Sequence, residues 1–170
     1  MSVKRDVPNL RRHQLVRLFE RAVLQSHHPE AFRIVHYGLM HDHFHVLVEA
    51  RDRMALARGM QRLNIRVAKR VNRAVGRKGR VFVDRYHRHD LGTPLEVRRA
   101  LRYVILNRQI WLERRGRSRE SRGIDGCSSG RWFDGWTRRV TARDGPVVLP
   151  PRTWLMRVGW RKWGLIDTPP

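Results

Sequence analysis

Three histidines alternate with other residues at the start of an apolar stretch. His41, His43 and His45 stand at every second position, and residues 46–48, which follow them, are apolar and mostly β-branched, which favours a strand. Side chains two residues apart project from the same face of a strand, so His43 and His45 are expected to point the same way. Two imidazoles on one strand can bind one metal ion, although the spacing does not identify the metal. A lone histidine on a strand is more often a surface or core residue, and the alternation by itself leaves both interpretations open.

A second pair of polar side chains falls in a predicted helix. Thr93, Pro94 and Glu96 are typical of a helix start, with threonine at the N-cap, proline at the first position and glutamate three residues after the cap. Tyr103 and Asn107 are four residues apart in this helix and therefore face the same way. A tyrosine on the shoulder of a helix is ordinarily a half-buried packing residue. Tyr103 differs from such a residue because the Asn107 carboxamide lies one helical turn further on.

The elements that position these side chains follow from the hydrophobic pattern. Apolar residues recur at helical spacing in three stretches, and two strand-like runs separated by a few polar residues indicate an antiparallel hairpin. Residues 2–4 are too few to be assigned to a strand. We expect helices over about 10–26, over 54–75 and from residue 93, a hairpin of residues 31–40 with 43–49, and a strand that begins at residue 81 and continues to 89.

The charge of the chain predicts a polyanionic partner. The sequence has 37 Lys and Arg against 15 Asp and Glu, a net charge of +22, and nucleic acid is the first candidate for such a protein. The basic face of the predicted helix 54–75 could simply be solvated, and the basic segment 76–80 could form a simple helix-to-strand turn. The candidate phosphate-binding residues lie on the predicted helix 54–75 and in the turn and strand after it: Arg66, Lys69, Arg70, Arg73, Arg77, Lys78, Arg80, Arg85 and Arg88.

Composition also limits the class of protein. The single cysteine, Cys127, excludes an internal disulfide framework and a zinc cluster built on cysteines. No apolar run approaches the roughly 18 residues of a membrane-spanning helix, and no signal-type segment opens the chain, so we expect a cytoplasmic, nucleoid-associated protein. A chain of 170 residues suits one domain with a real core.

The composition changes after Trp111. Residues 113–130 are rich in Arg, Ser and Gly and predict a flexible linker, which is followed by a Trp- and Arg-rich extension at residues 131–170. Tryptophans among arginines could stack on unpaired bases or pack back onto the core. We favour back-packing.

The motifs and their order resemble the single-tyrosine HUH transposases, specifically the REP-associated branch of the insertion-sequence transposases. HUH denotes two histidines around an apolar residue, which His43-Phe44-His45 matches, and the later signature of Tyr, apolar residues and Asn is matched by Tyr103 and Asn107. The Gly79-Arg80-Val81-Phe82 stretch and the pair Arg85-Tyr86 are also similar to the family's connecting strand. The resemblance covers about residues 10–112.

This resemblance implies an α+β fold in which residues 1–112 form the catalytic domain. A ferredoxin-like antiparallel sheet would carry the histidine pair, with the tyrosine helix beside it. It further implies Mg²⁺ or Mn²⁺ held by His43, His45 and Asn107, and Tyr103 as the nucleophile that cuts single-stranded or hairpin DNA through a 5′-phosphotyrosine link. Related enzymes are monomers or homodimers, and both states stay open.

Two positions depart from the family pattern. His41-Asp42 stand where the family usually has Pro-Asn or Pro-Glu, and Arg108 stands where a proline commonly follows the asparagine. A non-catalytic DNA- or RNA-binding protein is therefore the alternative function. A small basic ribosome-associated protein would explain the charge but would leave the paired motifs to coincidence.

Overall fold

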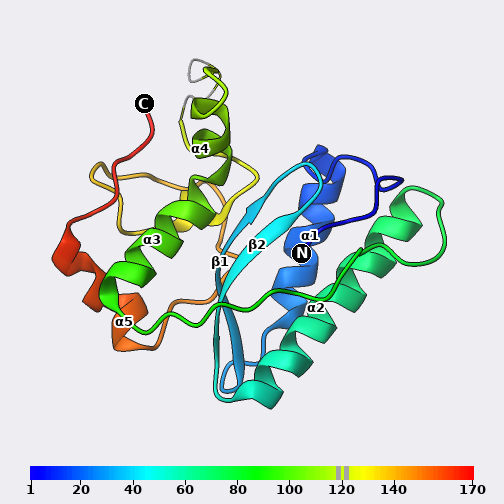
Figure 1. Ribbon diagram of the computed structural model, residues 1–170, viewed down its shortest axis with the longest axis horizontal. Coiled ribbons are helices and arrows are strands. Elements are labelled where there is room, and N and C mark those ends of the chain that lie inside the picture. The colour runs from blue at the N-terminus through cyan, green and yellow to red at the C-terminus, as the bar shows by residue number, and fades with distance from the viewer. Residues whose placement is uncertain (118–119, 121–122) are drawn as a thin grey trace.

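An antiparallel hairpin lies at the centre of the fold. In the computed structural model, which describes residues 1–117, 120 and 123–170, strand β1 (Phe32–Leu39) pairs with strand β2 (Phe44–Ala50). The hairpin predicted from the sequence is thus confirmed, and the fold is α+β. Figure 1 shows the hairpin between two groups of helices, with α1 and α2 on one side and α3 on the other.

Alternation along β2 explains this two-sided packing. Phe44, Val46 and Val48 face the core cluster that α1 (His13–Ser26) and α2 (Arg53–Ala74) cover, whereas Leu47 belongs to the cluster on the opposite face. The period of two along a strand sends successive side chains to opposite faces. Both helices were predicted within three residues of their observed ends. Asp52 starts α2, because its carboxylate accepts a hydrogen bond from the Ala55 amide at 2.7 Å.

The second face of the hairpin is covered by helix α3 (Pro94–Ile105). Its start is the predicted capping box, in which Thr93 accepts from the Glu96 amide and the Glu96 carboxylate accepts from the Thr93 amide. The short helix α4 (Asn107–Glu113) follows after a break at Leu106. Residues Val97, Leu101 and Val104 are the buried side of α3 that meets Leu47.

Two outer strands of the expected sheet are reduced to single bridges. Ser2 bridges to His43 and Val3 bridges to Phe82, both antiparallel, so the N-terminal segment lies between the beginning of β2 and residue 82. The spatial order β1, β2, residues 2–3, residue 82 is that of a ferredoxin-like sheet, consistent with the expected fold. The strand predicted over 81–89 is wrong beyond the bridge, since residues 84–92 run without regular structure.

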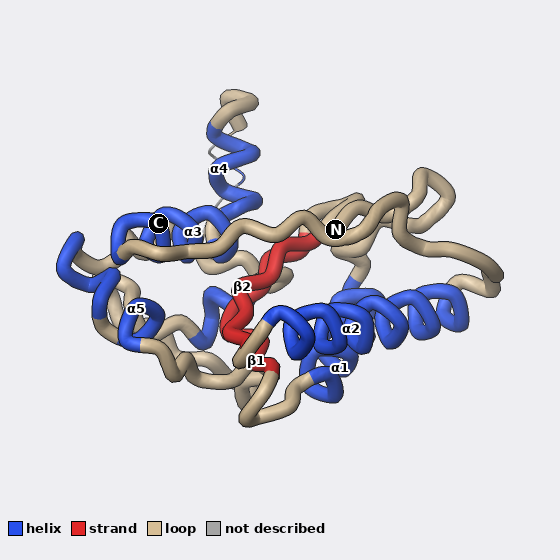
Figure 2. Tube along the Cα trace, turned by 60° about the horizontal axis from the view of Figure 1, so that its bottom comes forward, coloured by secondary structure: helices blue, strands red, loops and turns tan. Residues whose placement is uncertain are grey.

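The C-terminal residues pack back onto α3. The short helix α5 (Trp154–Arg157) and the 3₁₀ turn η3 (Gly159–Trp163) lie on the same side of the hairpin as α3, and Figure 2 shows α5 beside α3 from a second direction. The 3₁₀ turn η2 (Ser129–Trp132) lies against β1. Trp136 and Trp160 are buried in the cluster that contains Val97 and Leu101. These two tryptophans therefore serve core packing, whereas Trp154 and Trp163 are exposed.

Part of the predicted linker belongs to the folded domain. Residues 118–119 and 121–122, inside the segment 113–130, lie outside the described residues. By contrast, the Asp125 carboxylate accepts two hydrogen bonds from the Arg11 guanidinium, at 2.6 and 2.8 Å, and the buried Ser129 hydroxyl accepts from the Tyr37 amide at 3.0 Å. Residues 125–130 are fixed by these contacts and are not a flexible linker.

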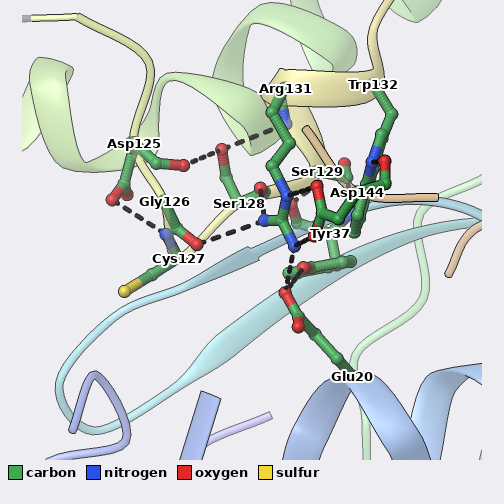
Figure 3. A network of polar contacts seen from close by, with 11 residues as sticks. Glu20, Tyr37, Asp125, Gly126, Cys127, Ser128, Ser129, Arg131, Trp132 and Asp144 are labelled. Atoms are coloured by element: carbon green, nitrogen blue, oxygen red, sulfur yellow. Dashed lines mark hydrogen bonds and ion pairs between the residues drawn. The ribbon is translucent and has the colours of Figure 1, made fainter. Parts of the chain in front are cut away.

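Arg131 joins the C-terminal segment to the rest of the domain (Figure 3). Its guanidinium donates to Glu20 of α1 at 2.7 Å and to Asp144 at 3.1 and 3.2 Å, and it stacks over the Trp132 ring. The Tyr37 hydroxyl donates to the same Glu20 carboxylate at 2.6 Å. One partly buried cation thus connects α1, β1 and two stretches of the C-terminal segment.

In the described part of the chain, no helix is both long and apolar enough to cross a membrane.

Candidate active site

His43 and His45 lie side by side at the beginning of β2. Their ring centroids are 5.0 Å apart and the rings are nearly perpendicular. Because they are two residues apart on the strand, they share the face that α3 covers. The structure therefore brings together the two histidines that the sequence paired.

A glycine on β1 lets the tyrosine helix approach this face. Gly38 is the register partner of His45, and a Cβ atom at Gly38 would lie 2.2 Å from the Val104 carbonyl oxygen of α3. Only a residue without a side chain fits this approach. Val104 follows Tyr103 in the helix, so the same contact places the tyrosine over the strand.

Tyr103 faces His45. The phenol oxygen lies 3.5 Å from His45 Nε2, and the two ring centroids are 5.0 Å apart. This distance is long for a hydrogen bond, so the hydroxyl is near the imidazole without being held tightly. The side chain is 43% exposed, which leaves it accessible to a large substrate. Tyr103 and both histidines come from the same chain.

The electrostatic environment keeps His45 neutral. Burial lowers the pKa of His45 to about 4, with smaller contributions from the neighbouring His43 and the N-terminal ammonium group. At neutral pH its ring therefore carries a free nitrogen lone pair. A neutral imidazole is the form that binds metal ions or accepts a proton.

Asp42 is a member of the site that the sequence analysis did not assign. Its carboxylate lies 2.7 Å from His43 Nδ1 and 3.4 Å from His41 Nε2. Partial burial opposes ionisation of Asp42, but the contact with His43 and the nearby histidine charges lower its pKa overall. A carboxylate behind a metal-binding histidine fixes the ring's orientation and tautomer. In the sequence, this role is indicated by an aspartate that stands between His41 and His43.

Asn107 is the first residue of α4 and is buried, with 8% of its surface exposed. Among the described residues, its carboxamide makes no hydrogen bond, to either histidine or to any other group. The described part of the chain also contains no group of three or more His, Cys, Asp or Glu side chains arranged around a metal. The histidine pair fits an imidazole-ligated metal, and Asn107 as a third ligand stays a prediction.

The predicted phosphate-binding residues divide into two groups. Arg77 is ion-paired with Asp6, Arg88 is ion-paired with Asp90, and Arg70 donates to Gln25 of α1. The others form no ion pair within the described ranges: Arg66, Lys69, Arg73, Lys78, Arg80 and Arg85. Lys69 and Arg73 are exposed on the last turns of α2, where they are available to a polyanion.

A cavity of about 540 Å³ extends from His45 along the outer edge of β2. Its walls come from β2, the first half of α2, residues 86–91 and α5. Its size is in the range of cavities that hold small organic groups. No sequence pattern indicates this cavity, because its walls lie far apart along the chain.

A family model described as "Transposase IS200 like" matches residues 7–106, which is more than half of the chain. The matched range contains His43, His45 and Tyr103 and ends one residue before Asn107. No curated protein and no solved structure matches the chain.

Proposed function

The chain belongs to the IS200-like transposase family, and from this premise we propose that it cuts and rejoins single-stranded DNA as a single-tyrosine HUH transposase of the REP-associated kind. DNA transposition and recombination are the general activity of this family. The observation that carries the finer proposal is the position of the Tyr103 hydroxyl, 3.5 Å from His45 Nε2 and accessible at the surface.

In the proposed reaction Tyr103 is the nucleophile. Its hydroxyl oxygen attacks the phosphorus of a phosphodiester, the bond from phosphorus to the 3′ oxygen breaks, and the proton ends on the released 3′ hydroxyl. The product is a 5′-phosphotyrosine, which conserves the energy of the phosphodiester bond. Attack by a 3′ hydroxyl on this link reverses the reaction and joins a new strand without ATP.

The histidine pair would hold a divalent metal at this position. Neutral His45 and the adjacent His43 supply imidazole nitrogens from one face of β2, Asp42 orients His43, and the Asn107 oxygen is the proposed third ligand. Mg²⁺ or Mn²⁺ bound there would polarise the scissile phosphate and stabilise the charge that develops on it. Tyr103 is held over the same face by the contact between Gly38 and Val104.

The basic surface would hold the DNA backbone. Exposed residues of α2 and the turn after it, such as Lys69, Arg73 and Lys78, are free of ion pairs within the described residues and would contact phosphates. Both the histidines and the tyrosine come from one chain, so we propose that a monomer contains the histidine pair and the nucleophile together.

The test is covalent trapping on hairpin DNA with a single-stranded flank. The strand is labelled at its 3′ end and incubated with the protein and Mg²⁺ or Mn²⁺. We expect a labelled protein band that survives denaturation, disappears in Tyr103→Phe and persists in the matched control Tyr86→Phe. An adduct that survives in Tyr103→Phe would remove Tyr103 from this role. DNA binding without any adduct in either metal would support the alternative of a non-catalytic DNA-binding protein.

A further inference from the structure

Two exposed tryptophans lie on the C-terminal surface formed by α5 and η3. Trp154 is 62% exposed and Trp163 is 51% exposed, whereas Trp160 between them is 1% exposed and belongs to the core. These residues lie outside the range that the family model matches. Core packing explains the position of Trp160, but it does not explain why Trp154 and Trp163 are tryptophans.

The Trp154 ring is held in place while it remains exposed. A Cβ atom at Gly159 would lie 2.5 Å from an atom of the Trp154 ring, so the ring rests directly on the backbone of Gly159. A large side chain that is already fixed loses little conformational entropy when it binds a ligand. Trp154 is thus an ordered aromatic surface presented to the solvent.

The segment that carries these tryptophans is basic, and the Glu49 carboxylate of β2 accepts hydrogen bonds from the Arg152 and Thr153 amides at its start. Residues 152–165 contain three arginines and one lysine and no acidic residue. Within the described residues, Arg157 and Lys162 form no ion pair, whereas Arg152 and Arg161 pair with Glu30 and Asp134 from other segments. The Lys162 ammonium group lies 5.5 Å from the centre of the Trp163 ring. Aromatic rings beside free cations match the bases and phosphates of a single strand of nucleic acid.

The same surface adjoins the candidate active site. Leu155 and Met156, which follow Trp154 in α5, line the cavity that His45 also lines. Tyr103 lies beside His45, so a strand whose phosphate is at Tyr103 is close to a cavity that extends to α5.

We propose that Trp154 and Trp163 stack on unpaired bases of the DNA strand that is cut at Tyr103, and that Arg157 and Lys162 contact its phosphates. The identity of this strand rests on the proposed function, whereas the stacking itself does not. A duplex cannot provide this contact because its bases are already stacked on one another. A protein partner is disfavoured by the cations around the rings, which an apolar protein interface would have to desolvate.

Fluorescence anisotropy measures the proposed contact. The probes are a short fluorescein-labelled single strand of mixed sequence and the same strand annealed to its complement. Stacking contributes about 1–3 kcal/mol per base, so Trp154→Ala should weaken single-strand binding by roughly 5- to 150-fold. Duplex binding should change less than about twofold, because the phosphate contacts are retained.

Three further variants control for folding and position. Trp154→Phe keeps an aromatic ring and should retain most of the affinity. Gly159→Ala, which displaces the Trp154 ring, should weaken single-strand binding without removing any group that contacts DNA. Leu24→Ala removes an exposed apolar side chain from α1 and should leave the affinity unchanged.

The outcomes separate this inference from the proposed function. Unchanged single-strand affinity in both Trp154→Ala and Trp163→Ala would overturn the stacking site, even if the Tyr103 adduct forms. An equal loss for single strand and duplex would overturn it too. Loss of self-association with unchanged DNA affinity would assign the surface to a second copy of the chain. A selective loss of single-strand binding would support the inference even if the wild type forms no adduct.

Discussion

The Gly38 backbone lies directly against the Val104 carbonyl oxygen, which a Cβ atom at Gly38 would approach to 2.2 Å. Gly38 pairs with His45 across the hairpin, and Val104 follows Tyr103 in α3. The closest contact between helix and sheet therefore adjoins the two side chains of the candidate site. The distance between Tyr103 and His45 therefore depends on Gly38, which has no side chain.

Gly38→Ala tests this dependence. The new methyl group meets backbone atoms, so α3 must move away from the sheet, and we expect a loss of about 1–3 kcal/mol in the free energy of unfolding. A displacement of about 1 Å can lower a rate by roughly 10²-fold. The rate of adduct formation should therefore fall by up to about 100-fold in protein that is still folded. Urea unfolding and timed adduct assays measure the two effects.

Gly145→Ala is the matched control, because nothing lies within 4 Å of a Cβ atom at that position. Its stability and its rate should equal those of the wild type. A normal rate of adduct formation in Gly38→Ala would contradict the role assigned to the close contact.

Stability should fall with acid because of His36. Burial lowers the pKa of His36 from 6.5 to about 4, and its ring contacts the Ser129 hydroxyl at 3.0 Å. The unfolded chain binds a proton at this residue below pH 6.5, whereas the folded protein does not until about pH 4. The folded state is therefore favoured above pH 6.5 and loses roughly 2 kcal/mol between pH 7 and pH 5 from this residue.

Urea unfolding of the wild type and His36→Asn at both pH values measures this contribution. His45, whose pKa is also lowered, is present in both proteins, so the difference between their pH dependences reports His36. Equal pH dependences would show that His36 does not contribute.

Arg131→Gln should destabilise the protein by disconnecting the C-terminal segment. The change leaves Glu20, which is mostly buried, without its cation and removes contacts to Asp144. Breaking a buried ion pair costs about 3–5 kcal/mol, and the partial exposure of this one reduces the expected loss to about 2–3 kcal/mol. Arg117→Gln, which removes an exposed pair with Glu120, should change the melting temperature little. Equal shifts in the two variants would contradict the distinction.

The division of the basic residues predicts different salt dependences. Lys69→Gln combined with Arg73→Gln should weaken single-strand DNA binding and lower the slope of log affinity against log salt by about 0.7 for each lost phosphate contact. Arg77→Gln should lower the slope less, because Arg77 is already paired with Asp6. Affinity measured at several salt concentrations checks this. A larger effect of Arg77→Gln would reverse the assignment.

Local rules predicted the elements well. The alternation of His43, Phe44 and His45 placed β2, and Thr93 with Glu96 placed the start of α3, because strand alternation and helix capping depend on neighbouring residues. The sequence could not show that Tyr103 meets His45, since this depends on the register across the hairpin and on the approach at Gly38.

The errors arose where distant segments decide the structure. Residues 125–130 look like a linker by composition, yet Arg11 and Tyr37 provide their partners from more than 80 residues away. Residues 2–3 are too few for a strand by themselves, but they gain hydrogen bonds from segments on both sides. Composition and periodicity carry no information about such contacts.

The most direct test of the central claim is to locate the covalent DNA link. The wild-type protein is trapped on the hairpin substrate with Mg²⁺ or Mn²⁺, the DNA is trimmed with nuclease, and the adduct is digested and sequenced by mass spectrometry. We predict a nucleotide joined through its 5′ phosphate to the Tyr103 oxygen. A nucleotide on another residue, Tyr86 included, or one joined through its 3′ phosphate would contradict the account.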